Sequence, residues 1–354
     1  MQLLLGLLAW LCIAATAAPW IRSDYWWIRG FDFPRLQIFL LGLVTGAAML
    51  FFWPHGGLFY QSTGGLLLCC LLFQGVKIYP YTPLAWKQVH KAPTSSINAQ
   101  FALLIVNVLM ENRQAQRLVE LIRAVNPDVL LTVETNAWWD KQLCILEDTY
   151  SSTVKQLQEN YYGMALYSRF PLVQPAVKFL VSEDIPSIHT QVVLRSGELI
   201  WLHCLHPAPP SPIGADTATE RDAELLIVGK EVRQKETPVI VAGDLNDVAW
   251  SYTTALFQKT SGLLDPRIGR GMYNSYNANN ILMRWPLDHV FHSKHFLCSM
   301  LRRLPAFGSD HFPVYIVLSL APQAENLQEE PQLEADEAEE VEAKITRVTQ
   351  KDTL

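Results

Sequence analysis

The sequence predicts an α+β fold in which two packed sheets are flanked by helices, preceded by two or three transmembrane helices. Three observations support this prediction. Long apolar runs are confined to the first 78 residues, short strand-like and helix-like segments alternate between residues 100 and 319, and residues 321–354 are acidic. The predicted organisation is therefore a membrane region (1–78), a linker (79–99), a folded domain (100–319) and a tail (320–354).

The membrane region contains three apolar runs, at about residues 3–18, 36–53 and 58–76. The first two lack charged residues and have about the length that crosses a bilayer. The third run contains several polar residues near its start, so a buried or re-entrant segment is the alternative to a third crossing. Tryptophans at the ends of the runs suit the headgroup level of a bilayer. No Lys or Arg precedes the first run, which favours an uncleaved anchor over a signal peptide.

The formal net charge of −6 arises in the tail. Residues 321–354 hold ten acidic and three basic residues, so the rest of the chain is nearly neutral. Because residues 325–342 have little apolar content, we expect a solvated, disordered tail. A nearly neutral domain without a basic stripe argues against extended binding of nucleic acid. The six cysteines show neither CxxC nor zinc-ligand spacing.

The folded domain opens with a predicted strand (101–108), an amphipathic helix (113–125) and a second strand (128–133). Residues 219–235 predict another helix, with Thr219 as its N-cap. The remaining strand candidates are short and rich in β-branched or aromatic residues; they are 163–168, 189–195, 198–203, 239–243, 287–292 and 314–318.

Polar residues suited to phosphate chemistry stand at the ends of these strands. Asp244 and Asn246 lie two apart after an apolar run, so on an extended backbone both would face the same side. In Asp310-His311, a carboxylate suited to a hard cation such as Mg²⁺ precedes an imidazole that exchanges protons near neutral pH. Asp288 interrupts an apolar strand, where a buried acid needs a partner, and an imidazole is the obvious one.

Five further residues are candidates. Glu134 directly follows the second strand, where a metal ligand is the alternative to a solvated turn residue, and Asn107 interrupts the apolar first strand. His206 precedes a proline-rich loop, where it could meet a substrate. Arg221 and Arg267 could bind an anionic substrate, because guanidinium groups pair well with phosphate. Solvated surface arginine is the alternative for both.

These motifs, in this order and approximate spacing, resemble the endonuclease/exonuclease/phosphatase superfamily; they are Asn107, Glu134, His206, Gly243-Asp244-Leu245-Asn246, Leu287-Asp288-His289-Val290-Phe291 and Gly308-Ser309-Asp310-His311. The resemblance covers about residues 100 to 319 and implies the DNase I-like fold, a four-layer α/β/β/α sandwich. With the apolar runs, the chain resembles membrane-anchored bacterial members.

The resemblance also implies roles. Glu134, with Asn107 and Asp310, would hold Mg²⁺, with Mn²⁺ as the alternative ion. Asp244, assisted by Asn246, would orient and deprotonate the attacking water. His311, held by Asp288, and His206 would donate hydrogen bonds to the phosphate. One departure is Leu109, which stands where many relatives carry a second Asn or Asp.

The fold does not identify the substrate. We expect hydrolysis of a phosphate ester or pyrophosphate on a lipid or small molecule, because a membrane anchor keeps the site near lipid headgroups. The alternatives are a membrane-anchored nuclease and a non-catalytic module that binds a partner at the membrane. If three helices span the bilayer, the basic residues of the first loop and of the linker favour a cytoplasmic catalytic domain. If only two helices span the bilayer, the catalytic domain would lie on the opposite side.

Overall fold

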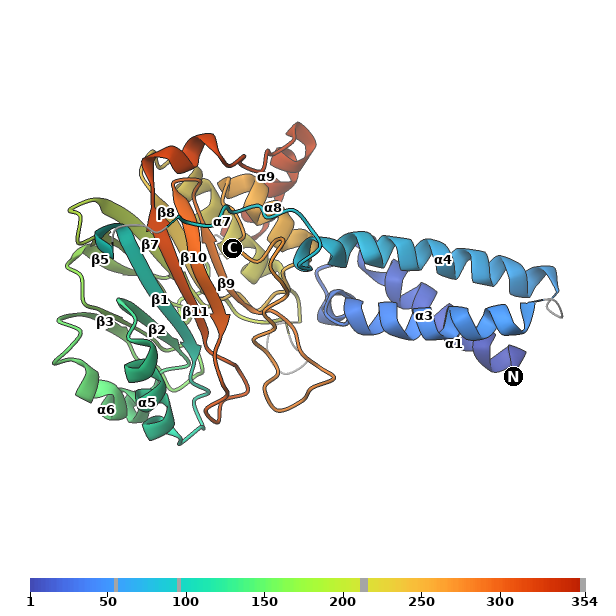
Figure 1. Ribbon diagram of the computed structural model, residues 1–354, viewed down its shortest axis with the longest axis horizontal. Coiled ribbons are helices and arrows are strands. Elements are labelled where there is room, and N and C mark those ends of the chain that lie inside the picture. The colour runs from blue at the N-terminus through green and yellow to red at the C-terminus, as the bar shows by residue number, and fades with distance from the viewer. Residues whose placement is uncertain (54–56, 94–96, 211–215, 351–354) are drawn as a thin grey trace.

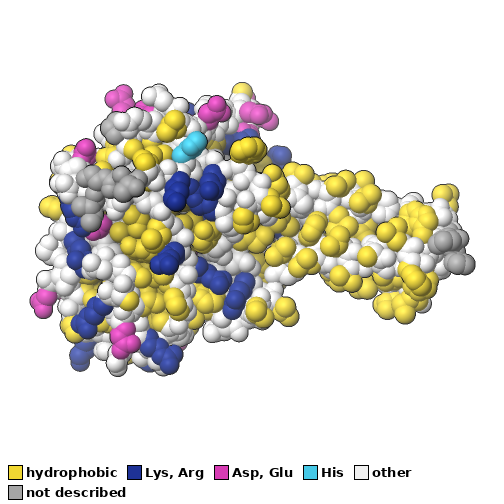
Figure 2. Space-filling model, in the orientation of Figure 1, with side chains coloured by type: hydrophobic (Ala, Val, Ile, Leu, Met, Phe, Trp, Pro, Cys, Tyr) yellow, Lys and Arg dark blue, Asp and Glu magenta, His cyan; other side chains and the backbone are white. Residues whose placement is uncertain are grey.

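The computed structural model describes residues 1–53, 57–93, 97–210 and 216–350, and it shows a helical bundle projecting from an α+β domain (Figure 1). The bundle consists of α1 (Gln2–Ala17), α3 (Arg35–Phe51) and α4 (Leu58–Ile78), which pack on one another. The surface of the bundle seen in Figure 2 is largely apolar, as expected for helices that face lipid.

Within the described residues, two helices are long and apolar enough to cross a membrane, Gln2–Ile21 and Leu58–Tyr81. The third apolar run, for which the sequence left a re-entrant segment as the alternative, is therefore one of these two candidate helices. Helix α3 qualifies only together with the short preceding segment Trp26–Asp32, from which it is bent by 66°, so the number of candidate spans is two or three. The short segment contains α2 (Trp26–Arg29) and η2 (Gly30–Asp32).

A polar chain ties the three helices together at the end that meets the domain. Arg35 Nη1 donates to Gln74 Oε1 at 3.2 Å, and Gln74 Nε2 donates to Thr16 Oγ1 at 3.1 Å. The three residues come from α3, α4 and α1, and all are buried. Since an unpaired polar group in a bilayer is costly, these bonds allow the three side chains to lie inside an apolar bundle.

The domain contains two sheets packed face to face. The first has the order β10-β11-β1-β2-β4-β3, and the second has the order β5-β6-β7-β8-β9. The strands of the first sheet are β10 (Phe296–Arg303), β11 (Val314–Leu320), β1 (Gln100–Asn107), β2 (Val129–Val133), β4 (Met164–Ser168) and β3 (Ser152–Gln156). Those of the second are β5 (Leu172–Lys178), β6 (Ser187–Val193), β7 (Leu199–Leu205), β8 (Val239–Asp244) and β9 (Asp288–His292).

Helices cover the outer face of each sheet. The first sheet carries α5 (Ala115–Val125) and α6 (Ala137–Leu143), and the second carries α7 (Thr219–Arg233) and α8 (Tyr252–Ser261). Between the sheets, side chains of both inner faces form one core that includes Leu103, Leu131, Leu202 and Ile240. The predicted four-layer α/β/β/α sandwich is therefore confirmed.

The strands that the sequence did not predict are β3, β5 and β10, and each lies at the edge of its sheet. An edge strand is partly exposed, so its sequence lacks a long apolar run; β5 even contains a proline. The predicted helix 219–235 is α7, but Ala218 is its N-cap and Thr219 its first helical residue. The predicted linker packs against the domain, since Tyr81 is buried and donates to Ala249 O at 2.6 Å.

The prediction of a disordered tail is wrong for the described part of the tail. The short helix η7 (Pro322–Asn326) follows β11, and α9 (Ala335–Thr349) begins with a capping box formed by Glu334 and Glu337. Val341 of α9 is buried against Leu226 of α7 and Leu256 of α8. The acidic face of α9 also meets lysines of these helices, in the pairs Lys230–Glu342 and Lys259–Glu337. The composition misled because the few apolar residues of the tail share one helical face.

Glu224 on α7 makes the stability of the domain depend on pH. It is 2% exposed, and its Oε1 has no hydrogen-bond partner among the described residues. Burial raises the pKa of this carboxyl from 4.5 to about 8. Between these values the unfolded chain has lost a proton that the folded chain keeps, so a rise in pH lowers the free energy of unfolding by about 1.4 kcal/mol per unit.

We therefore expect Glu224→Gln to raise the thermal unfolding temperature above that of the unaltered protein at a pH near 8, and to have little effect near 4.5. The measurement is a thermal melt of the full chain in detergent at several pH values. Glu236→Gln, an exposed change after the same helix, is the control and should leave the pH dependence unchanged. Equal curves for Glu224→Gln and the unaltered protein would contradict the assignment.

Candidate active site

The candidate site lies where two parallel strand pairs end. Strands β1 and β2 are parallel neighbours connected through α5, and β7 and β8 are parallel neighbours connected through α7. Parallel strands present their carboxyl ends at one edge of a sheet. Asn107 ends β1, Glu134 follows β2, His206 follows β7 and Asp244 ends β8, so the packing of the two sheets brings all four residues together.

Asn107 connects the two sheets at this edge. Its Nδ2 donates to Glu134 Oε1 at 2.8 Å and to Asp244 Oδ2 at 3.1 Å. The other oxygen of Glu134 accepts from the backbone N of Met110 at 3.2 Å. The Asn107 side chain is therefore an amide bridge behind two carboxylates, and its own Oδ1 accepts from the backbone N of Leu109 at 3.0 Å.

The sequence prediction for His311 and Asp288 agrees with their geometry. His311 Nδ1 lies 2.7 Å from Asp288 Oδ2, and its Nε2 lies 3.5 Å from Asp244 Oδ2. Burial alone would favour the neutral ring, but Asp288, Asp244 and Asp310 outweigh it and raise the pKa of His311 to about 10. His311 is thus an imidazolium held between two carboxylates, and both of its nitrogens carry protons.

His206 and Asn246 lie on the other side of Asp244. His206 Nε2 is 3.9 Å from Asp244 Oδ2, and its Nδ1 has no hydrogen-bond partner among the described residues. Burial lowers the pKa of His206, with the nearby His311 charge acting in the same direction, so this ring is neutral. Asn246 donates from its backbone N to Asp244 Oδ1 at 3.1 Å and from Nδ2 to Pro207 O at 3.0 Å.

The backbone at the site adopts conformations that non-glycine residues rarely use. Glu134 has φ 60° and Asn246 has φ 52°, both in the left-handed region. Gly243 has φ 148°, and a Cβ on it would lie 1.9 Å from Leu205 O. Glycine is therefore required where β8 passes the end of β7. Such unusual backbone conformations gather at functional sites, where the fold compensates their cost.

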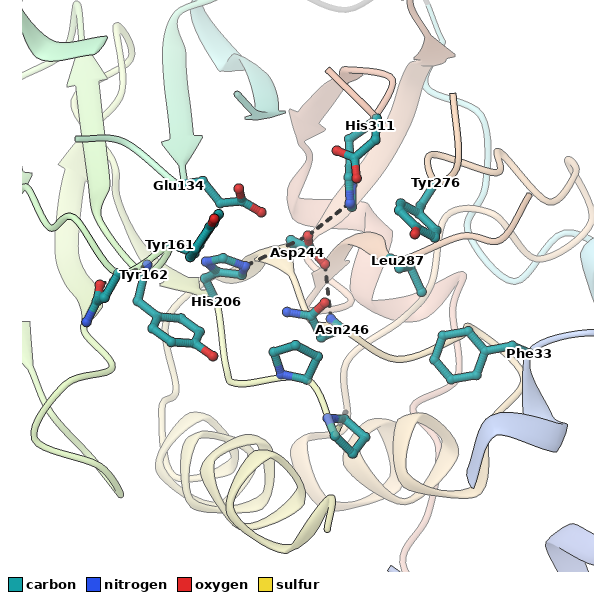
Figure 3. A pocket seen from close by; sticks show the side chains of 14 residues that line it. Phe33, Glu134, Tyr161, Tyr162, His206, Asp244, Asn246, Tyr276, Leu287 and His311 are labelled. Atoms are coloured by element: carbon teal, nitrogen blue, oxygen red, sulfur yellow. Dashed lines mark hydrogen bonds and ion pairs between the residues drawn. The ribbon is translucent and has the colours of Figure 1, made fainter. Parts of the chain in front are cut away.

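These side chains border one cavity of about 420 Å³ (Figure 3). Glu134, His206, Asp244, Asn246, Asp310 and His311 line it, while Asn107 and Asp288 support the lining residues from behind. The structure thus brings together eight of the ten residues predicted for the site. The cavity is also lined by residues that were not predicted individually for the site; they are Phe33, Asn160, Tyr161, Tyr162, Pro209, Pro210, Tyr276 and Leu287.

The charge balance of the cluster fits a divalent cation. Four carboxyl groups, those of Glu134, Asp244, Asp288 and Asp310, surround a single imidazolium. Burial raises the pKa of Glu134 to about 7, against hydrogen bonds from Asn107 and Met110, and Asp244 adds to the rise. Burial also raises the pKa values of Asp244 and Asp310. Oxygen ligands with excess negative charge are the donor set that hard cations such as Mg²⁺ prefer.

The two arginines predicted to bind substrate do not reach the cavity. Arg221 is 1% exposed; it pairs with Asp222 at 2.9 Å and with Asp247 at 3.3 Å, and its Nη1 donates to Asn246 O at 2.7 Å. Arg267 is also buried, with Asp265 at 2.7 Å. The prediction is wrong for both, because each guanidinium is buried, is bound by a carboxylate and does not line the cavity. Arg221 instead supports the backbone of a cavity residue.

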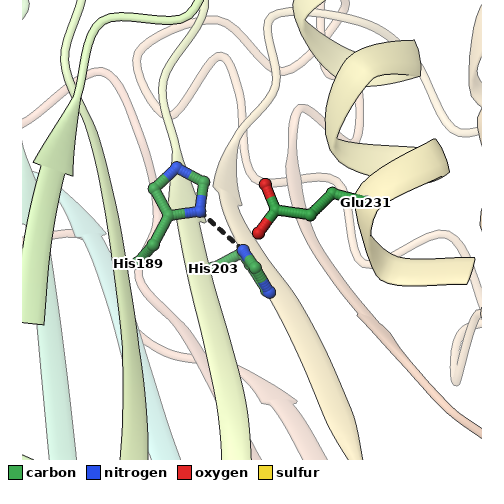
Figure 4. A group of neighbouring side chains, drawn as sticks. All are labelled: His189, His203 and Glu231. Atoms are coloured by element: carbon green, nitrogen blue, oxygen red, sulfur yellow. Dashed lines mark hydrogen bonds between the residues drawn. The ribbon is translucent and has the colours of Figure 1, made fainter. Parts of the chain in front are cut away.

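A second cluster of potential metal ligands lies between β6, β7 and α7 (Figure 4). His189 Nδ1 is 2.6 Å from His203 Nδ1, and Ser187 Oγ lies 2.8 Å from His189 Nε2. If Ser187 donates to Lys178 O, His189 Nε2 must donate to Ser187, and His203 then donates to His189.

This order of donors leaves both rings neutral. Burial favours the same state, since it lowers the pKa of His189 to about 3 and that of His203 to about 4. The ammonium groups of Lys178, at 3.1 Å, and Lys235, at 3.5 Å, already balance Glu231. The charge of Glu231 is therefore balanced without a cation, while the buried His203 Nε2 has no hydrogen-bond partner among the described residues. Because both rings are neutral and the carboxylate is already paired, we interpret this cluster as structural.

Comparisons with known proteins identify the family. The model of the endonuclease/exonuclease/phosphatase family matches residues 104–311, which is more than half of the chain. The chain belongs to this family, as the motifs predicted. No curated protein sequence matches the chain.

Solved structures share the fold at low sequence identity. D. rerio TDP2 complexed with a single-strand DNA product is 18% identical, with a TM-score of 0.52 over 62% of this chain and 99% of that one. The human Nocturnin catalytic domain with a bound sulfate anion is 18% identical, with a TM-score of 0.52 over 64% and 97%. An endonuclease/exonuclease/phosphatase from Beutenbergia cavernae is 18% identical, with a TM-score of 0.51 over 63% and 72%.

If the cluster holds a divalent cation, Glu134 should be essential for binding it. We expect Mg²⁺ or Mn²⁺ to raise the unfolding temperature of the full chain, because a ligand that binds only the folded state stabilises it. Glu134→Gln removes a negative ligand and should weaken this dependence on metal concentration by about tenfold or more.

The matched control is Glu198→Gln, an exposed change in the turn before β7. It should keep the metal response of the unaltered protein. An unchanged response in Glu134→Gln would remove Glu134 from the proposed ligands.

Proposed function

We propose that the protein is a membrane-anchored, metal-dependent phosphohydrolase or phosphodiesterase that directs water onto a phosphate ester or pyrophosphate of a lipid or small molecule. The observation that carries this proposal is the cluster at the strand ends, where Asp244 lies 3.5 Å from the His311 imidazolium and shares a cavity with Glu134 and Asp310. Mg²⁺ is the favoured ion and Mn²⁺ the alternative. Glu134 and Asp310, with Asn107 behind them, would hold it.

A bound divalent cation would neutralise charge on the phosphate oxygens. The other roles belong to the chain itself. Asp244 accepts hydrogen bonds from Asn246 N and from Asn107, which fix the orientation of its carboxylate. A fixed carboxylate can orient a water molecule and accept its proton as the water attacks. The raised pKa of Asp244, caused by burial, makes it a stronger base than a carboxylate in water.

The two histidines would act on the phosphate. His311 is an imidazolium fixed by Asp288, so its Nε2 can donate to an oxygen on which negative charge develops. The neutral His206 can donate from one nitrogen only. Both side chains line the cavity; His206 lies beside Tyr161 and Tyr162, and His311 lies on the other side of Asp244 (Figure 3). Fixed donors next to a carboxylate base form an arrangement suited to in-line displacement at phosphorus.

The kind of substrate follows from the cavity and the anchor. A cavity of about 420 Å³ lined by Phe33, Tyr162, Pro209 and Tyr276 suits one phosphate group with an organic substituent. The sulfate bound to the Nocturnin domain shows that this fold accommodates a tetrahedral anion in that protein. The candidate spans support a substrate at a membrane. The DNA product in the TDP2 structure is the reason to keep a membrane-anchored nuclease as the second candidate.

Activity is the direct test. We expect the purified full chain with Mg²⁺ to hydrolyse a generic aryl phosphodiester. Asp244→Asn should lower the rate about 10²–10⁴-fold because it removes the base. His311→Ala should lower the rate about 10²–10³-fold because it removes a donor to the transition state.

The controls are Asp184→Asn and His90→Ala, two exposed residues outside the cavity, which should keep the activity of the unaltered protein. Full activity in both Asp244→Asn and His311→Ala would discard the site. No activity in the unaltered protein on aryl phosphodiesters, inositol phosphates, phospholipids, polyprenyl pyrophosphates or single-stranded DNA would favour the non-catalytic module. A rate on DNA well above that on lipid phosphates would favour the nuclease.

We also propose that the catalytic domain is cytoplasmic. With three crossings, the loop 18–34 and the segment after α4 lie on the side of the domain, and both carry basic residues, among them Arg22 and Lys87. Positive charge near the ends of spans favours the cytoplasm. A reporter fused after Leu354 that is active only in the cytoplasm should be active. Activity of a reporter that functions only outside the cytoplasm would contradict this side.

A further inference from the structure

Large apolar side chains outside the bundle are exposed where the bundle meets the domain. They come from three segments: the loop between α1 and α3, the linker after α4, and the loop 277–285 before β9. Trp20 and Trp27 belong to the first segment, and Leu84 and Trp86 belong to the second. Ile281 and Leu282 belong to the third, and they are 75% and 74% exposed. We call these six residues the apolar collar.

The loop 277–285 forms a hydrogen-bonded hairpin. Tyr276 and Trp285 exchange backbone hydrogen bonds at its base, and Asn277 N donates to Met283 O at 3.0 Å. Arg284 Nε donates to Asn277 O at 3.2 Å across the hairpin. The exposed Ile281 and Leu282 are therefore held at the tip of a fixed structure.

The tip lies beside a candidate membrane helix. Gln37 Nε2, in the first turn of α3, donates to Leu282 O at 2.7 Å. In Figure 1 the segment before β9 reaches toward the end of the bundle that meets the domain. If the bundle spans a bilayer, this contact places Ile281 and Leu282 at the membrane surface, where apolar side chains gain by leaving water.

The base of the same hairpin lies at the cavity. Tyr276 lines the cavity, and its ring centroid is 5.0 Å from that of His311. Ala278 N donates to Asp310 O at 2.6 Å. Phe33, just before α3, also lines the cavity, and its ring centroid is 5.5 Å from that of Trp285. One hairpin of nine residues therefore connects the start of a candidate span to two of the predicted active-site residues.

Two arginines add positive charge beside this hairpin. The guanidinium carbons of Arg284 and Arg303 lie 4.9 Å and 4.2 Å from the ring centroid of Phe312. Unlike Arg221 and Arg267, neither is bound by a carboxylate in an ion pair of the described residues. Cations next to an apolar tip suit an anionic bilayer surface better than they suit an apolar protein partner.

We propose that the apolar collar seats the catalytic domain on the lipid bilayer, and that the hairpin 277–285 is an inserted lip through which a phosphate-bearing amphiphile enters the cavity. The substrate class is then a lipid whose phosphate lies at the bilayer surface, and this part rests on the function proposed above. The seating of the lip does not depend on catalysis, so the two can be tested separately.

The first test measures the position of the lip without any reaction. Ile281→Cys is labelled with a polarity-sensitive fluorophore in the full chain, with Cys69→Ser and Cys144→Ser to remove the exposed cysteines. The protein is placed in nanodiscs of phosphatidylcholine and phosphatidylglycerol that contain lipid with a nitroxide near its headgroup. We expect strong quenching of the label at position 281.

The control is Ile145→Cys, which is 52% exposed next to α6, on the part of the domain away from the bundle (Figure 1). Its label should show no quenching. Absence of quenching at position 281, or equal quenching at both positions, would overturn the seating.

The second test measures entry of the substrate. The double change Ile281→Asp and Leu282→Asp should lower the rate on a fluorescent phospholipid in vesicles by about tenfold or more, because it places two charges at the membrane surface. The rate on a soluble aryl phosphodiester should not change, since neither residue lines the cavity. Ile145→Asp should keep both rates.

A loss on both substrates, or on neither, would overturn the lip as an entrance for lipid. If the unaltered protein hydrolyses neither substrate, the proposed function fails instead, while the quenching result still decides whether the lip is inserted. If quenching of the label at position 281 in detergent-free vesicles changes with protein concentration, a second copy of the chain covers the apolar collar. That outcome would also overturn the proposal that the collar contacts the bilayer.

Discussion

The excess of buried negative charge around Asp244 is the constraint on which the site depends. Asp244 lies 3.1 Å from Asn107 Nδ2 and 3.5 Å from His311 Nε2, and three further carboxyl groups lie around the same cavity edge. A folded core does not tolerate such a group of charges without compensation. One imidazolium balances one carboxylate, and burial raises the pKa values of Glu134 and Asp310, with the nearby Asp244 adding to both shifts. The fold therefore maintains an arrangement that a cation would stabilise.

The topology explains why residues distant in the sequence can form this arrangement. Each sheet contains a parallel pair connected by a helix, β1 with β2 and β7 with β8, and the carboxyl ends of both pairs meet at one edge. The remaining acids arrive on antiparallel strands or their loops, Asp288 at the start of β9 and Asp310 before β11. An edge strand could vary without moving these ends, which is consistent with weak sequence signals in β3, β5 and β10.

Whether a residue could be predicted from the sequence depends on whether its role is visible without its partners in space. An acid at the end of an apolar strand, or within one, is unusual in itself, so the sequence indicates Glu134, Asp244 and Asp288 without any knowledge of their neighbours. An arginine reveals its role only through its partners. The partners of Arg221 include Asp247, and Asp222 is also approached by Lys344 of α9 at 3.1 Å and by Arg29 of α2 at 3.9 Å. The sequence offers no local sign of these contacts, and for the same reason it could not show that the acidic tail folds.

That buried ion network also connects the segment before α3, helix α9 of the tail and the site. Arg29 enters the domain from the membrane-proximal loop and lies 3.4 Å from Asp247, next to Asn246 in sequence. The cations Arg29, Arg221 and Lys344 together outweigh burial and hold the pKa of Asp222 well below its usual range. Removing any one of them would leave a buried charge without its partner, which is costly.

A flexible tether between the N-terminal helices and the domain would not require a buried ion network between them. If the anchor served only to keep the enzyme near a membrane, an unstructured linker would be sufficient, and no side chain of the membrane region would have to enter the domain. Instead Phe33 lines the catalytic cavity, Arg29 pairs beside Asn246, and Gln37 bonds to the hairpin that borders Asp310. These three contacts fix the orientation of the cavity relative to the N-terminal helical bundle. A fixed orientation is useful when the substrate approaches from one direction, and for a domain held at a bilayer that direction is the lipid surface.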